Sequence, residues 1–192
     1  MSEQAHAIRR FAFLGPAAAD LSDLSPRVRT ATAVAGGAAA GLVVARFGFG
    51  GEALVGVILI AALAVLSAID IERRVIPNRI VIPSFAVVLV AQLALFPDRA
   101  FEWVAASLAT GFVLLVAALV KPGGLGYGDV KLGLLLGAGL GEEVMTCLIV
   151  AVFAIWPVAV YLYVRHGRAA RTMALPFGPF LALGAVVALL AS

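Results

Sequence analysis

The sequence predicts an all-α membrane protein, a polytopic helical bundle with about six to seven transmembrane helices. Only 13% of its 192 residues are charged and 63% are hydrophobic, which lies outside the usual range of soluble globular domains. The apolar residues form long windows that are almost free of charge, each close to the length that crosses a bilayer. Backbone groups in hydrocarbon must pair with each other, so these windows are expected to be helices.

Six windows are predicted to span the membrane, and they cover residues 30–45, 53–69, 80–96, 103–120, 145–164 and 174–191. A seventh apolar stretch, 132–140, is too short to cross comfortably alone, so it is predicted to continue from Asp129 as a short or tilted helix. No linker divides the chain. Residues 30–192 are therefore predicted to form one membrane-embedded domain, and residues 1–29 a cytoplasmic or interfacial leader.

The charged loops predict which ends of the helices share a membrane face. Loops 71–79 and 165–171 carry three arginines each, whereas 97–102 and 141–143 are net acidic. Positively charged loops are typical of the cytoplasmic side, so the first two loops are predicted there and the acidic pair opposite. Topology thus accounts for the net charge of +3, and no nucleic-acid partner is predicted.

Two carboxylates adjoin long apolar helices on the predicted cytoplasmic side. Asp70 ends the second window, and Asp129 precedes the seventh stretch. The chain crosses the membrane twice between them, so both are expected at one face, turned inward because an acid facing lipid is costly. If they meet, the pair is expected to share one proton. One carboxylate could then take a proton from water while its protonated neighbour polarises a peptide carbonyl, and the sequence does not assign the two roles.

Other interpretations of these acids stay open at this point. The glycine-rich segment KPGGLGYGD offers no side-chain barrier to an extended substrate, but Asp129 could equally cap a helix that begins at DVKL. The two acids could also form the proton relay of a transporter or channel component, or belong to an assembly factor without chemistry. No metal or cofactor is predicted, because the chain has one cysteine, Cys147, and two distant histidines.

Three segments, in this order, resemble the type 4 prepilin peptidases, which belong to the GxGD class of membrane aspartic proteases. They are IDIERRVIPN, GYGDVKL and LPFGPFLALG. The residues that match the family's motifs, or shape the site on that resemblance, are Asp70, Pro77, Asn78, Gly126, Gly128, Asp129, Lys131, Pro176, Gly178 and Pro179.

The resemblance implies that Asp70 and Asp129 are the catalytic pair. It also implies removal of short basic leaders from type 4 prepilin or pseudopilin precursors at the cytoplasmic face of the bacterial inner membrane. Longer family members carry a domain with paired Cys-x-x-Cys motifs, associated with zinc and N-methylation, that this sequence lacks. The chain thus resembles a short, peptidase-only member of the kind serving Flp-type pili. Presenilin-like cleavage within a substrate helix is the alternative inside the GxGD class.

The remaining motif residues have two interpretations each. Lys131 lies two residues past Asp129 and either snorkels to lipid headgroups or holds a substrate carboxylate. Pro77 and Asn78 are predicted to form a turn and the N-cap of the next span, and this turn could also place Asp70. The PFGP segment, which holds Pro176, Gly178 and Pro179, is predicted either simply to start the last helix or also to line the active site.

Overall fold

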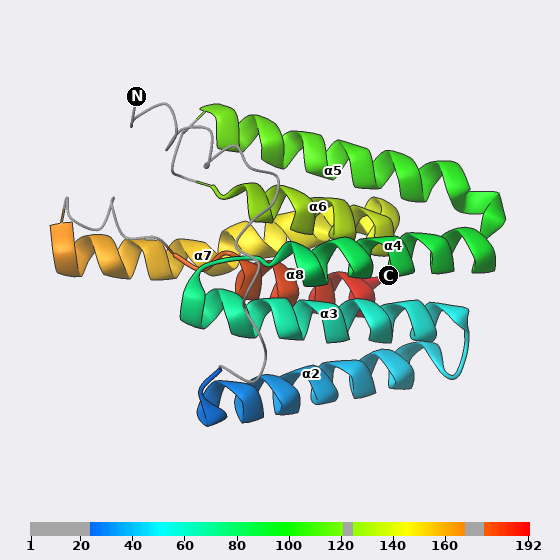
Figure 1. Cartoon of the computed structure of the whole chain (residues 1–192), viewed down its shortest axis with the longest axis horizontal. Helices are drawn as coiled ribbons and strands as arrows, with labels where there is room; N and C mark the ends of the chain where they lie inside the picture. Colours follow the sequence, from blue (N-terminus) through cyan, green and yellow to red (C-terminus); the bar gives the residue numbers. More distant parts are fainter. Residues whose placement is uncertain (1–23, 121–124, 168–174) are drawn as a thin grey trace.

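The computed structural model describes residues 24–120, 125–167 and 175–192, and these residues form a helical bundle without strands (Figure 1). The predicted all-α fold class is confirmed. Residues 1–23 of the predicted leader lie outside the described part of the chain. The α-helices are α2 (Pro26–Phe47), α3 (Gly51–Arg73), α4 (Asn78–Leu95), α5 (Ala100–Val120), α6 (Tyr127–Leu140), α7 (Val144–His166) and α8 (Gly178–Ala191), and the single 3-10 turns are η2 (Pro97–Arg99) and η3 (Gly141–Glu143).

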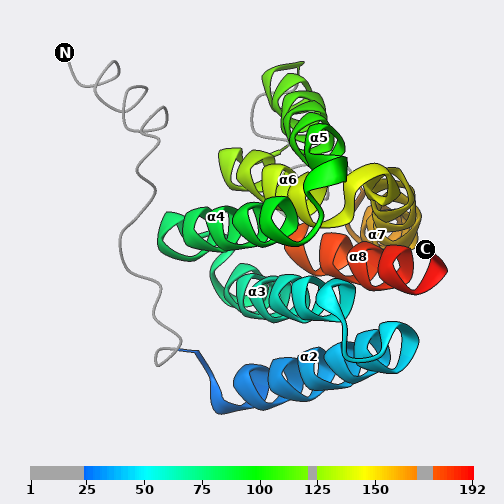
Figure 2. The same ribbon diagram turned by 90° about the vertical axis from the view of Figure 1, so that its right-hand side faces the viewer.

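The helices pack in pairs around a leucine-rich centre. Helix α2 packs on α3, α5 on α6 and α7 on α8, while α3 also contacts α8 and α4 contacts α6. Figure 2 shows α2 and α5 at opposite outer edges of the bundle. The core between them holds fully buried leucines such as Leu59, Leu135 and Leu181, whereas Phe112 and Trp156 are exposed. Large apolar side chains on the outer surface are what a bilayer requires of a spanning bundle.

The helices run alternately in opposite directions, so the connections gather at two ends (Figure 1). One end holds the α3–α4 loop, the start of α6 and the start of α8, which are the three segments singled out in the sequence. The other end holds the α2–α3, α4–α5 and α6–α7 turns. The even number of crossings between Asp70 and Asp129 therefore has the predicted structural consequence, because both acids belong to the first end.

Five stretches in the described residues are long and apolar enough to cross a membrane, where six or seven were predicted. The count differs because Tyr127–His166 is counted as one apolar stretch, although the chain reverses at η3 between α6 and α7, and because α8 is short. Helices α6 and α8 have 14 residues each, or roughly 21 Å at 1.5 Å per residue. The window 174–191 overestimates α8, since the helix begins only at Gly178, with Pro179 in its first turn.

Helix α2 is fastened to the end of α3. It begins at Pro26, inside the predicted leader 1–29, and Ser25 is its N-cap. The backbone N–H of Ser25 donates to the Glu72 carboxylate at 3.0 Å, and the Ser25 hydroxyl donates to the same carboxylate. This contact fixes the start of α2 to the last turn of α3, on the side of the helix away from the buried Asp70 side chain.

The close packing of α5 on α6 depends on Gly137. A Cβ at this position would overlap the backbone of Ala106 and Ser107. We expect Gly137→Ala to lower the free energy of unfolding by about 3 kcal/mol, because backbone atoms of a neighbouring helix cannot move aside as a side chain can. Thermal unfolding in detergent measures this. Gly37→Ala in α2 is the matched control, since its Cβ would meet nothing within 4 Å, and a midpoint equal to that of the control would contradict the expectation.

Candidate active site

Asp70 lies near the end of α3 and is held by the start of α8. The helix ends at Arg73 because Arg74 adopts a left-handed conformation (φ 52°), and the Arg74 N–H donates to the Asp70 carbonyl at 2.9 Å. The Asp70 side chain points into the protein and the residue is only 5% exposed. Its Oδ2 accepts a hydrogen bond from the Gly178 N–H at 2.8 Å. Residues 108 positions apart are thereby joined at one point.

Gly178 is a glycine because the carboxylate of Asp70 comes so close. A Cβ built on Gly178 would lie 2.9 Å from Asp70 Oδ2, closer than real Cβ atoms approach an oxygen. The backbone donor can therefore reach the carboxylate only if position 178 has no side chain. The close approach of Asp70 explains why this position of the PFGP segment is a glycine. The segment therefore begins α8 and also holds the Asp70 carboxylate.

Asp129 lies at the third position of α6, in its first turn. Its Oδ2 accepts a hydrogen bond from the Gly126 N–H at 3.0 Å, and its own N–H donates to the Gly126 carbonyl at 3.0 Å. The predicted capping role is therefore present, although the carboxylate reaches backwards rather than along DVKL. A carboxylate has about four acceptor positions on two oxygens, so one capping bond leaves capacity for chemistry. Capping and catalysis are compatible roles for this residue.

The two acids lie at the same end of the bundle. The charge of Asp70 acts on Asp129, and the charge of Arg74 acts on Asp70. Direct contact between the two carboxylates stays a prediction. Arg74 was not singled out in the sequence, although its place four residues after Asp70 is a detectable signal.

The loop between α3 and α4 packs directly on the start of α6. A Cβ on Gly128 would lie 2.8 Å from Ile76 Cβ, so this glycine too permits close approach. Gly126 is extended (φ −82°), with no need for the left-handed conformation. Gly128 of the GYGD motif therefore brings two segments together, where the sequence had suggested an open path for substrate and freedom to turn.

Lys131 corrects one expectation. The Lys131 ammonium does not extend to headgroups: the residue is 9% exposed and its Nζ donates to Asn78 Oδ1 at 2.6 Å. The N-cap predicted at Pro77 and Asn78 is present, since Pro77 is the N-cap of α4 and Asn78 is the first helical residue. The bond joins α6 to α4 just beyond the two acids. The rotation of α6 directs the Lys131 side chain towards α4. The spacing between Asp129 and Lys131 does not by itself reveal this direction.

The other predicted residues lie around this centre. Pro77 is buried between α3 and α4, and Pro176 and Pro179 are half-buried on either side of Gly178. Ser67 was missed in the sequence. It is buried one turn before Asp70, and its hydroxyl has no hydrogen-bond partner in the described residues. Its spacing of three residues from Asp70 on a helix would have placed it on the same face.

Comparison with known proteins agrees with the motifs. The family model of the type IV leader peptidases matches residues 57–163, more than half of the chain. The chain is 35% identical to a prepilin leader peptidase/N-methyltransferase of Bacillus subtilis over 80% of its length and 60% of the relative's. Proteins of the same name from Burkholderia pseudomallei and Pseudomonas aeruginosa are 35% and 31% identical, over 81% and 86% of the chain and 52% and 57% of theirs.

The chain therefore spans about half to three fifths of the length of these relatives. No solved structure matches it significantly. The matched residues include both acids, the GYGD motif and the contact between Lys131 and Asn78. On this evidence, the chain belongs to the type IV leader peptidase family.

Proposed function

We propose that this protein is a membrane aspartic endopeptidase that removes the leader peptide from type 4 prepilin-like precursors, including Flp-type pilins. The observation that carries the proposal is the convergence of three distant motifs on one end of the bundle. There the buried Asp70 is held by Gly178, and Asp129 lies within electrostatic range of it. The names of the related proteins support the same class of substrate.

In the proposed reaction the two acids share one proton. The ionised carboxylate takes a proton from water, and the resulting hydroxide attacks the carbonyl carbon of the scissile peptide bond. The protonated neighbour donates to the carbonyl oxygen as it gains charge, and a proton then passes to the leaving amine. The backbone N–H groups of Gly178 and Gly126 keep the two carboxylates oriented throughout, because neither donor can rotate away.

The position of the acids suits such a substrate. They lie at the end of the bundle that carries the arginine-rich α3–α4 loop, which we assign to the cytoplasmic side of the bacterial inner membrane. A precursor whose apolar N-terminal helix lies in the bilayer would present its basic leader at this surface. The proposal concerns the peptidase activity, which the matched family model supports.

The proposal is tested by incubating the purified chain, in detergent or lipid, with a type 4 prepilin and, separately, with a Flp-type prepilin. We expect a single cut at the leader junction, identified by the mass of the product. Cleavage of only one precursor would define the substrate subclass. Intact precursors, together with proton flux in liposomes that hold the same protein, would refute the peptidase and favour the proton relay.

A further inference from the structure

The reaction proposed above gives no role to the bond between Lys131 and Asn78. Lys131 is 9% exposed, and its Nζ donates to Asn78 Oδ1 at 2.6 Å. Burying an ammonium group is costly unless the group is paired, and an apolar side chain such as methionine could fill the same space without that cost. The buried ammonium therefore needs an explanation beyond the stability of the bundle.

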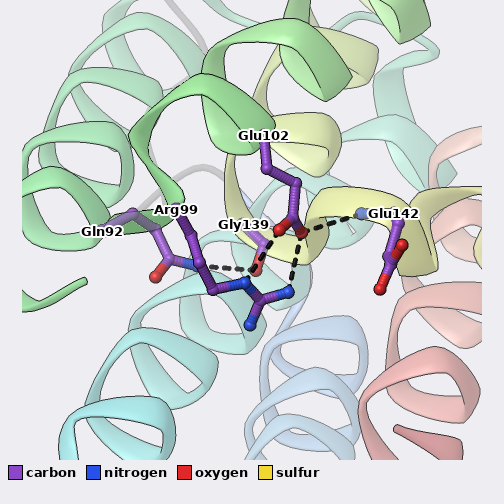
Figure 3. Close-up of polar contacts among 5 residues, drawn as sticks. All are labelled: Gln92, Arg99, Glu102, Gly139 and Glu142. Atoms are coloured by element: carbon purple, nitrogen blue, oxygen red, sulfur yellow. Dashed lines mark hydrogen bonds and ion pairs between the residues drawn. The ribbon is translucent and has the colours of Figure 1, made fainter. Parts of the chain in front are cut away.

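Helices α4 and α6 are also fastened to each other away from the acids. The two helices are in contact, and their buried residues, such as Val81 and Leu135, belong to one apolar cluster. At the far end of the bundle the Gln92 Nε2, on α4, donates to the Gly139 carbonyl of α6 at 3.2 Å (Figure 3). Packing and the Gln92 bond thus hold the helices together at the far end, while the lysine bond acts at the end where the acids lie.

The bond between Lys131 and Asn78 gives the two acids a short connection. Asp70 precedes Asn78 by eight positions, across the α3–α4 loop, and Asp129 precedes Lys131 by two positions in α6. The bond therefore links, through ten positions of chain, two acids that are 59 positions apart in the sequence. A movement of the loop relative to α6 would change the position of one acid relative to the other.

The α3–α4 loop also packs on the first turn of α6. Ile76 is 7% exposed, and a Cβ on Gly128 would lie 2.8 Å from Ile76 Cβ. Pro77, the next residue of the loop, is buried. Apolar contacts therefore lie directly beside the polar bond, and together they fix the loop on α6.

We propose that Lys131 and Asn78 are positioning residues for the peptidase reaction, whose bond fixes the α3–α4 loop on α6 and thereby sets the position of Asp70 relative to Asp129. This inference rests on the function proposed above. Hydrogen bonds donated by an ammonium group are shorter and stronger than those between neutral groups, which suits a contact that must hold a loop in place. Neither residue exchanges a proton with the substrate in this role.

Methionine substitutions at the two ends of the α4–α6 contact test the role. Lys131→Met removes the bond at the acid end, and we expect it to lower kcat by about a hundredfold with KM within about twofold, because a displacement of about 1 Å can cost that much in rate. Gln92→Met removes the bond at the far end, and Arg79→Gln removes an exposed positive charge beside Asn78. Both controls should keep kcat within about twofold of the wild type. Steady-state cleavage measures this, on chains that thermal unfolding in detergent shows to be folded.

Substitutions of Asn78 separate the bond from the rest of the side chain. Asn78→Ala removes the acceptor and should lower kcat about as far as Lys131→Met. Asn78→Asp keeps an acceptor for the ammonium, so its kcat should exceed that of Asn78→Ala by at least about tenfold. The Lys131→Met/Asn78→Ala double variant should cleave no more slowly than the less active single variant, because both substitutions remove the same bond. If Lys131→Met fails to fold, the comparison of Asn78→Ala with Asn78→Asp decides.

A second measurement follows the loop itself and does not require peptidase activity. Ile76→Cys is introduced into a Cys147→Ala chain, which has no other cysteine, and the rate of labelling by a water-soluble maleimide is measured. Position 76 is buried, so labelling should be slow. Adding Lys131→Met should speed it by at least about tenfold, because the loop then opens more often, whereas adding Gln92→Met should not.

The two measurements distinguish failure of this inference from failure of the proposed function. A wild-type chain that cleaves no precursor would refute the peptidase, while the labelling rates would still test whether Lys131 holds the loop. The inference would be overturned by equal labelling with and without Lys131→Met, by a folded Lys131→Met chain with wild-type kcat, or by equal losses in Asn78→Ala and Asn78→Asp.

Discussion

Asp70→Asn and Asp129→Asn are each expected to abolish leader cleavage, lowering kcat/KM by about a thousandfold or more. Asparagine has nearly the same shape and can still accept from the N–H of Gly178 or Gly126, so the helices should stay in place. It can neither take a proton from water nor donate an acidic one, and proton transfer of this kind contributes about 10²–10⁴-fold. The rate of product formation from a purified precursor measures the loss.

The double variant provides a stricter test of a shared mechanism. The effects of substituting residues that act as one unit do not add. The Asp70→Asn/Asp129→Asn double variant should therefore cleave no more slowly than the less active of the two single variants. Asp98→Asn is the matched control, because this acid is exposed at the other end of the bundle. Retention of wild-type rates by either single variant would remove the paired-acid mechanism, and multiplied losses in the double variant would make the two acids independent.

Gly178→Ala is expected to lower kcat by about a hundredfold, with little change in KM. The added methyl group would lie 2.9 Å from Asp70 Oδ2, so either the start of α8 or the carboxylate must move. Displacing a reacting group by about 1 Å can cost about a hundredfold in rate. The measurement is steady-state cleavage at several precursor concentrations, which separates kcat from KM.

Two controls accompany Gly178→Ala. Gly37→Ala makes the same chemical change where a Cβ meets nothing, and it should keep full activity. Thermal unfolding of Gly178→Ala in detergent shows whether the loss comes from unfolding or from the site. A folded Gly178→Ala chain that cleaves within twofold of the wild type would mean that the bond to Asp70 does not orient the carboxylate for catalysis.

The pattern of apolar windows predicted the helices and the shared end of the two acids. The helices follow from the local composition. The shared end follows from the even number of membrane crossings between the two acids, and both can be read directly from the sequence. Helix ends were less certain: α3 continues past position 69 to Arg73, which puts Asp70 inside the helix. The left-handed residue that stops α3 is Arg74, and an arginine gives no warning of a positive φ.

Contacts between helices could not be read from the sequence in the same way. The pairing of Lys131 with Asn78 depends on how α6 is rotated against α4. The buried Gln92 Oε1 and Trp103 Nε1, which have no partner in the described residues, likewise depend on how the helices around them pack. Glycines illustrate the limit well. Their presence in GYGD suggested conformational freedom, while the structure uses Gly128 to let Ile76 approach.

The shortness of α6 and α8 bears on how the proposed hydrolysis takes place inside a membrane. At roughly 21 Å they fall short of the ~30 Å hydrocarbon layer, so lipid beside them must compress or give way to solvent. Both helices begin where the acids lie. Hydrolysis consumes one water molecule for every peptide bond cut. A local thinning of the bilayer at this place would bring that water to the substrate while the substrate stays in the membrane. Turnover would then depend on the acyl-chain length of the host membrane, with thicker membranes slowing it.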